Sequence, residues 1–313
     1  MDSDALIYAS LVHLRGLEGA ARGLSFLPRQ ASASVLNGRH ASRLRGRGLN
    51  FEEMRDYLPG DDVRSIDWKA TARTGSPHVR VFTEERDRPA LLVVDQRMSM
   101  FFGSERNMKS VTAAEAAAIA AFRILAAGDR VGGIVFDDDT RIELKPKRSR
   151  RAAHTLLESI AGLNAGLNAD RAATRRPGEL NEVLGGIARL AHHDHLVLVL
   201  SDFDGIDETT QRRLSGIAAH NDLVLMLVYD PLAVKQQSGA RVVVGDHTMQ
   251  AEVDLRSRET RAAVRGFSSR RLRQIIEWQT KINLSVLPLS AGEETLPQIR
   301  RLRGKMASRR RVR

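Results

Sequence analysis

The chain has 313 residues, a hydrophobic content of 42% and a formal net charge of +11. This length and apolar content suffice for a globular protein, and the 4% of aromatic residues predict a core of mainly aliphatic side chains. The absence of cysteine excludes disulfides, thiolate zinc sites and cysteine nucleophiles. No apolar run approaches the roughly 18 residues of a membrane span, and the N-terminus lacks the pattern of a signal peptide. We therefore expect a soluble, cytoplasmic protein.

Residues 1–88 form the first expected region, an N-terminal helical and charged segment. Residues 2–26 have helical spacing with Asp2 or Ser3 as N-cap, and charges of both signs crowd around a turn at Pro59-Gly60. Two interpretations fit these charges: ion pairs that tie the segment to the main domain, which we favour, or a docking surface for another protein. The residues of this possible docking segment are Asp61, Arg64, Asp67, Trp68 and Arg73.

Residues 89–290 form the second region, in which buried strands alternate with helices. The expected strands are residues 79–82, which precede the region, and then 90–94, 129–136, 141–145, 195–200, 222–229 and 282–289. The expected helices are residues 107–127, 151–162, 179–191 and 258–280, and residues 241–254 indicate an inserted β-hairpin. This alternation predicts an α/β fold with a doubly wound, mostly parallel sheet flanked by helices.

The third region, residues 291–313, is a basic C-terminal tail. Eight basic residues and no acid lie in its last fourteen positions, which leaves a net charge of +3 for the rest of the chain. They are Arg300, Arg301, Arg303, Lys305, Arg309, Arg310, Arg311 and Arg313. The simpler interpretation is a solvated extension, and the alternative is contact with phosphates, an anionic membrane surface or an acidic partner.

Acidic residues follow three of the expected strands. Asp95, Asp202 and Asp230 should therefore gather at the carboxyl edge of the sheet, where open α/β folds bind their ligands. Together with Ser99 they supply the hard oxygen ligands that suit Mg²⁺ or Mn²⁺. The sequence thus contains a candidate binding site but does not name its ligand.

Two sets of short motifs carry a family resemblance. The block with Pro59-Gly60-Asp61, Arg64 and Ile66-Asp67-Trp68 is highly specific, and further matches are Asp95, Ser99-Met100, Gly103, Lys109, Gly128-Asp129-Arg130-Val131-Gly132 and Ser201-Asp202-Phe203. With these residues the chain resembles the bacterial family called domain of unknown function 58. That family joins such an upstream segment to a domain similar to the von Willebrand factor A fold. The resemblance implies a metal-ion-dependent adhesion site with Asp95, Ser99 and Asp202 as ligands.

The chain departs from this adhesion-site pattern in the loop after the first strand. The pattern is D-x-S-x-S, but Arg97 stands at the first serine position, and Gly178 stands where a second loop should offer a threonine. A guanidinium beside aspartates repels Mg²⁺ and pairs with carboxylates. Our hypothesis is that Arg97 substitutes for the cation, so that no cofactor is expected, with Mg²⁺ as the alternative.

Other chemical readings of the sequence are weaker. Residues 196–205 resemble the first motif of haloacid-dehalogenase-type phosphatases, with Asp202 as nucleophile and Asp204 as acid/base, but the remaining motifs of that family are not evident. A P-loop at residues 103–110 is excluded because Met108 replaces a required glycine. Three histidines, at positions 192, 193 and 195, lead into a buried strand and do not favour a zinc site.

The resemblance implies a non-enzymatic interaction module. It would act as an adaptor with a MoxR-type AAA+ ATPase in a chaperone-like or envelope-associated assembly, and other von Willebrand factor A-domain proteins are further possible partners. The partner-binding residues at the sheet edge would be Asp95, Arg97, Ser99 and Asp202. The alternative is a nucleic-acid or anionic-surface binder that uses the basic tail. Because the chain shows no span, any membrane contact would come through a partner or the tail.

Overall fold

The computed structural model describes residues 7–21, 50–83, 88–169, 178–233, 241–246, 249–254, 271, 273–282 and 284–301. The chain divides into two compact units. The main unit comprises Met1–Phe26 and Arg88–Arg313, and the small unit comprises Leu27–Asp87. The expected region 1–88 is therefore split, because its first residues belong to the main unit.

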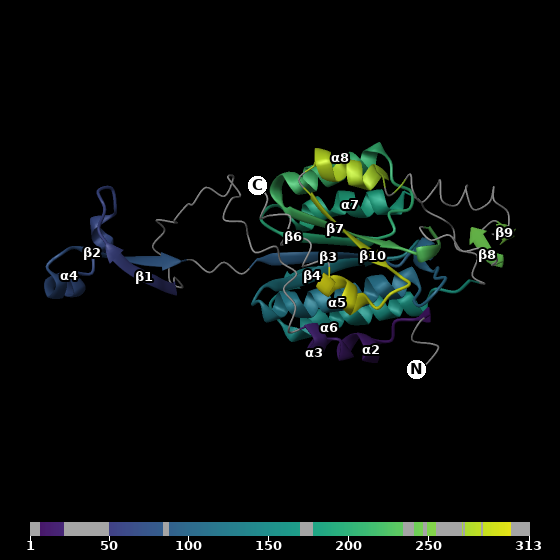
Figure 1. Cartoon of the computed structure of the whole chain (residues 1–313), viewed down its shortest axis with the longest axis horizontal. Helices are drawn as coiled ribbons and strands as arrows, with labels where there is room; N and C mark the ends of the chain where they lie inside the picture. Colours follow the sequence, from purple (N-terminus) through teal and green to yellow (C-terminus); the bar gives the residue numbers. More distant parts are fainter. Residues whose placement is uncertain are drawn as a thin grey trace. The chain divides into compact units, whose positions relative to one another are not determined.

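A six-stranded sheet lies at the centre of the main unit, in the order β10-β7-β6-β3-β4-β5 (Figure 1). Its strands are β3 (Pro89–Asp95), β4 (Arg130–Phe136), β5 (Arg141–Lys147), β6 (Leu196–Ser201), β7 (Asp222–Tyr229) and β10 (Leu284–Ser290). β5 runs antiparallel to β4, and the other neighbouring strands are parallel. The predicted mostly parallel α/β sheet is confirmed, and so is the strand expected at residues 141–145, which pairs with β4 as β5.

The central strands are buried on both faces, which explains their continuous apolar sequences. In β3, Val93 pairs with Ile134 of β4 and with Val199 of β6. Gly133 of β4 allows close packing, because a Cβ atom there would lie 2.5 Å from the carbonyl oxygen of Leu92. β3 is thus fixed from both sides, and its last residue, Asp95, has a defined position at the carboxyl edge.

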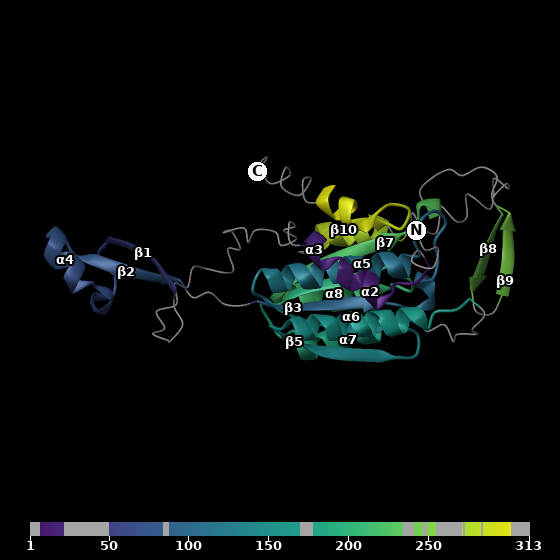
Figure 2. The same ribbon diagram turned by 90° about the horizontal axis from the view of Figure 1, so that it is seen from below.

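Helices cover both faces of this sheet (Figures 1 and 2). On one face lie α5 (Lys109–Ala126) and α6 (Arg150–Ala165), and on the other lie α7 (Glu179–Leu190) and α8 (Glu208–His220). The alanine-rich sequence of α5 keeps thirteen of its residues buried. Gly128 follows this helix with φ at +87°, the left-handed conformation in which a glycine commonly ends a helix. α8 was not predicted from the sequence.

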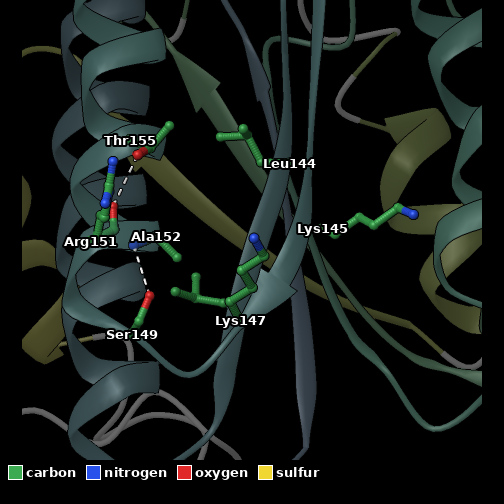
Figure 3. Close-up of a pocket in the computed structure, with 8 residues that line it drawn as sticks. Leu144, Lys145, Lys147, Ser149, Arg151, Ala152 and Thr155 are labelled. Atoms are coloured by element: carbon green, nitrogen blue, oxygen red, sulfur yellow. Dashed lines mark hydrogen bonds between the residues drawn. The ribbon is translucent and has the colours of Figure 1, made fainter.

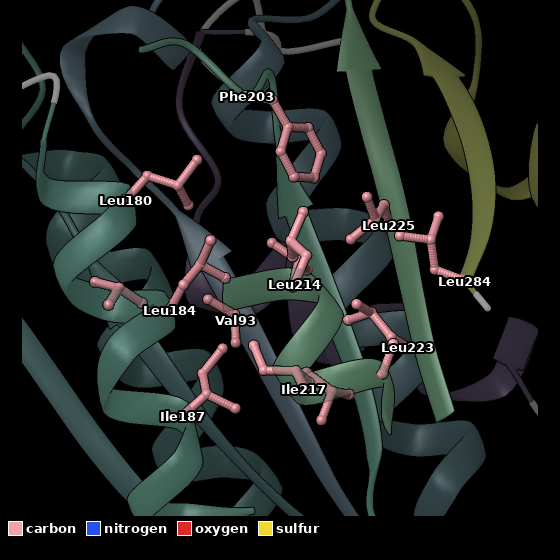
Figure 4. Close-up of a cluster of buried hydrophobic side chains, with 14 of the residues drawn as sticks. Val93, Leu180, Leu184, Ile187, Phe203, Leu214, Ile217, Leu223, Leu225 and Leu284 are labelled. Atoms are coloured by element: carbon pink, nitrogen blue, oxygen red, sulfur yellow. The ribbon is translucent and has the colours of Figure 1, made fainter. Parts of the chain in front are cut away.

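One large hydrophobic cluster joins α7 and α8 to the sheet (Figure 4). Leu180 and Ile187 of α7 pack with Leu214 of α8 against strand residues such as Val93 and Leu225. Trp278 belongs to the same cluster. Residues 273–281, which include it, are helical, whereas the first part of the expected helix 258–280 lies outside the described residues.

Short helices near both ends of the described main unit pack onto its body. The short helices α2 (Leu11–Gly16) and α3 (Glu18–Ala21) contact α5, and Leu14 is fully buried. Ser10 caps α2 by accepting a hydrogen bond from the His13 amide, whereas the N-cap positions expected at Asp2 or Ser3 lie outside the described residues. Residues 295–301 are helical, with Ile299 buried, so the expected tail 291–313 begins with packed structure instead of solvated chain.

The small unit contains an antiparallel pair, β1 (Asn50–Asp56) and β2 (His78–Thr83), together with η1 (Val63–Ser65) and α4 (Trp68–Thr74). Only the strand at residues 79–82 was predicted.

Two further strands of the main unit, β8 (Arg241–Asp246) and β9 (Met249–Asp254), form the expected hairpin. Within the described residues, no helix is long and apolar enough to cross a membrane.

Candidate functional site

Charged side chains converge where β3 and β6 end. We call this group the edge cluster, and its members are Asp95, Arg97, Lys109, Asp202, Asp204 and Arg271. Asp95 and Arg97 flank the turn between β3 and η2 (Met98–Met100), while Asp202 and Asp204 follow β6. Asp95, Arg97 and Asp202 are buried, with exposed fractions of 0%, 2% and 4%. Such burial requires that the charges be paired.

Arg97 pairs with Asp95 through a two-point contact. Its Nη2 donates to Asp95 Oδ2 at 2.7 Å and its Nε donates to Asp95 Oδ1 at 3.0 Å. The guanidinium also donates to the Asp204 carbonyl at 3.3 Å and lies 5.7 Å from the centre of the Phe136 ring. Burial opposes the charge, but the neighbouring carboxylates, Asp95 foremost, raise the pKa of Arg97 above its usual value. The predicted pairing of Arg97 with a carboxylate is confirmed.

Asp202 pairs with a cation that the site prediction did not include. Lys109, the first residue of α5, donates to Asp202 Oδ2 at 2.6 Å, and the Ser99 hydroxyl donates to Oδ1 at 3.3 Å. Burial disfavours the carboxylate, yet Lys109, Arg271 and Arg97 together hold the pKa of Asp202 well below its usual range. A signal for Lys109 was present, because a helix that follows a parallel strand begins at the carboxyl edge.

Arg271 completes the edge cluster from a distant part of the chain. It donates to the Asp204 carboxylate, and its Nη1 donates to the Asp202 carbonyl at 3.2 Å. Ser201 also contributes, since its hydroxyl donates to Asp95 Oδ2 at 2.6 Å. Nothing in the local sequence around Arg271 pointed to this edge.

Asp230 lies at the end of β7 but serves a different loop. It accepts hydrogen bonds from the Ser104 amide at 2.7 Å and from the Leu232 amide at 2.9 Å. The structure shows no bond between Asp230 and the edge cluster in the described residues. The prediction that three carboxylates share one site is therefore met by Asp95 and Asp202, with Asp204 in place of Asp230.

The donor atoms of the edge cluster do not fit a divalent metal in the arrangement observed. All four carboxylate oxygens of Asp95 and Asp202 already accept hydrogen bonds from protein groups. Over the described part of the chain, no group of three or more histidine or acidic side chains is placed to hold a metal ion. A metal at Asp95, Ser99 and Asp202 would have to displace Arg97 and Lys109. Gly178 is the N-cap of α7 and offers no hydroxyl.

In the possible docking segment, two acids form ion pairs inside the small unit. Asp61 accepts two hydrogen bonds from Arg55, at 2.7 and 2.9 Å. Asp67 caps α4 and accepts from Arg80 Nε at 2.7 Å, and the bond from the Ala70 amide, with Arg80, lowers the pKa of Asp67. These pairs stabilise the small unit itself, whereas the favoured interpretation had them tie it to the main domain. Trp68 is 66% exposed.

The other exposed members of the docking segment are Arg64 and Arg73. Of the basic tail, Arg300 and Arg301 lie in the terminal helix, and Arg301 pairs with Glu293 at 2.5 Å. The remaining six basic residues predicted for the tail lie outside the described residues. The histidines before β6 lie at the opposite edge, where His193 contacts Asp194 at 2.9 Å.

Comparison with known proteins identifies the family. The family model described as "Protein of unknown function DUF58" matches residues 53–274. The chain belongs to the DUF58 family. It is 32% identical over 230 residues to uncharacterized proteins of Mycobacterium bovis and Mycobacterium tuberculosis, a match that covers 74% of this chain and 70% of each relative. No solved structure matches this DUF58 chain.

Proposed function

We propose that this DUF58 protein is a non-enzymatic interaction module whose partner binds at the carboxyl edge of the sheet. The observation that supports the proposal is the edge cluster itself. Its charged groups are buried or half-buried and paired with one another, an arrangement that fixes the surrounding loops instead of presenting a free nucleophile or base. The rim of such a rigid edge suits recognition of another protein's side chains.

The partner we propose is a MoxR-type AAA+ ATPase, as the family resemblance implies. The possible assembly is chaperone-like or associated with the envelope. Ser99 is the natural probe of the edge, because it is a half-buried residue of η2 whose hydroxyl donates to Asp202. The charged residues beneath it are poor probes, since removing one leaves its partner buried and unpaired.

The test is an affinity purification with purified variants and the host's MoxR-type ATPase. Ser99→Arg places a long cation on the rim, and His192→Arg places the same side chain on an exposed site before β6, at the opposite edge. We expect wild type and His192→Arg to retain the ATPase and Ser99→Arg to lose it. Equal retention by all three, or no binding of the ATPase by wild type, contradicts the proposal.

A second candidate function is binding of anionic groups, and a basic pocket favours it. A cavity of about 380 Å³ lies between β5 and the start of α6, lined by Lys145, Lys147, Ser149, Arg151 and neighbouring apolar residues (Figure 3). The side chains of Lys147 and Arg151 are exposed. Pyrophosphate titration tests this candidate. Lys147→Gln and Arg151→Gln should weaken binding, whereas Arg189→Gln, which removes the same charge from α7, should not.

A further inference from the structure

We infer that Arg97 and Lys109 take the place of a divalent cation, so that the edge cluster is complete without metal. The inference concerns the same edge as the proposed function and deepens that proposal. Its readouts require no partner, so either can fail while the other stands. It assigns a role to Lys109 that the family resemblance does not, and it extends the hypothesis about Arg97 from charge to geometry.

The carboxylate oxygens of Asp95 and Asp202 already have protein groups as hydrogen-bond donors. Asp95 Oδ1 accepts from the amide and Nε of Arg97, at 2.9 and 3.0 Å, while Oδ2 accepts from Arg97 Nη2 and Ser201. Asp202 Oδ1 accepts from Ser99 and from the Asp204 amide, and Oδ2 accepts from Lys109. Because a carboxylate has about four acceptor positions, these bonds occupy most of the positions on both side chains.

The positive and negative charges of the edge cluster are balanced. Three carboxylates, of Asp95, Asp202 and Asp204, meet three cations, of Arg97, Lys109 and Arg271, so the edge cluster is neutral. The neighbouring Asp138, which accepts from the Met98 amide at 2.7 Å, adds one negative charge to the wider edge. A divalent ion added here would leave excess positive charge in a buried site, which is strongly unfavourable.

Arg97 and Lys109 also connect the loops that form the edge. A metal in such a site holds together the loops that supply its ligands. Arg97 already joins the loop after β3 to the loop after β6, through Asp95 and the Asp204 carbonyl. Lys109 joins the start of α5 to Asp202 of that second loop. The two side chains thus make the cross-links that a bound ion would otherwise provide.

The experiment is a Mn²⁺ titration, followed by electron paramagnetic resonance, together with thermal unfolding in the presence of Mg²⁺ or a chelator. We expect wild type to show no saturable Mn²⁺ binding at millimolar concentration and no change in its unfolding temperature. Arg97→Ser frees Asp95 and places a hydroxyl two residues after it. This variant should melt lower than wild type with chelator and recover with Mg²⁺. It should also bind Mn²⁺ saturably, and Asp202→Asn in the same background should abolish the binding.

Two further variants complete the design. Lys109→Met frees Asp202 Oδ2 and should also gain Mn²⁺ binding. It replaces Arg97→Ser as the test if that variant fails to fold. Arg88→Ser is the matched control, because it removes an arginine–aspartate pair, with Asp222 at 2.6 Å, from the opposite edge of the sheet. It should lose stability without any response to metal. Saturable Mn²⁺ binding by wild type that Asp202→Asn removes overturns the inference, as does a lack of binding by both folded variants.

Discussion

Arg97 is one of the largest fully buried side chains of the described chain, and its charge depends on Asp95. Asp95→Asn keeps the shape of the side chain and removes the charge that balances the guanidinium. We expect it to lower the free energy of unfolding by about 3–5 kcal/mol, as for other broken buried pairs. Urea denaturation measures this loss.

The double variant Asp95→Asn/Arg97→Met serves as the control for this substitution. Because both charges are gone, it should lose less stability than the sum of the single variants, and the double-mutant cycle gives the coupling. Strictly additive losses would show that the two charges do not depend on each other.

His13 contributes to the free energy of unfolding in a pH-dependent way. Its Nε2 lies 2.7 Å from Glu115 Oε1, and this hydrogen bond raises the pKa of His13 although burial opposes the charge. The stabilisation is therefore fully present below the unfolded pKa of about 6.5 and is lost as the pH rises through the higher folded pKa. The side chain is partly exposed, so we expect less than about 1 kcal/mol.

The measurement for His13 is the free energy of unfolding of wild type and of His13→Gln across this pH range. The difference between them should be larger in mildly acidic than in mildly alkaline buffer. Glu115→Gln should remove most of that pH dependence. A difference that grows with rising pH would contradict the assigned direction.

At the scale of elements, the terminal helix at residues 295–301 is part of the fold. Gln298 donates to the Ser290 carbonyl at 2.7 Å and accepts from the Ser290 amide at 2.7 Å, while Thr295 donates to Glu115. Truncation after Glu294 removes these contacts and buries nothing in their place, so we expect a clear fall in the unfolding temperature. Truncation after Gly304 keeps them and should leave that temperature nearly unchanged. Equal effects of the two truncations would refute this role.

The elements that could be predicted from sequence are those whose apolar pattern is strong. β3, β6 and β7 are continuous apolar runs, and α5 has apolar residues at every three or four positions. α8 was overlooked because its buried residues are few, and its clearest signal is the Asp207–Thr210 capping box. β1 is rich in charges, so its strand depends on pairing with β2.

The candidate site was predictable to the same limited extent. Asp95, Arg97, Ser99 and Asp202 are recognisable because they follow buried strands, and the structure brings them together. Arg271 could not be found in this way, since its approach to Asp204 depends on the path of the chain across the sheet.

At the scale of the whole molecule, each unit contains one of the two tryptophans. Trp68 in the small unit is 66% exposed, and Trp278 in the main unit is 2% exposed. We expect iodide to quench the fluorescence of Trp278→Phe, which retains Trp68, strongly and that of Trp68→Phe only weakly. Equally weak quenching of both variants would mean that Trp68 is covered in solution.

α5 makes contacts both at the edge cluster and far from it. It begins with Lys109, bound to Asp202, and six residues later carries Glu115, which is hydrogen-bonded to both His13 and Thr295. The same helix therefore links the edge cluster to α2 and to the terminal helix at residues 295–301. Displacing Lys109 from Asp202 should therefore change amide hydrogen exchange in α2 and in the helix at residues 295–301, far from the edge cluster itself.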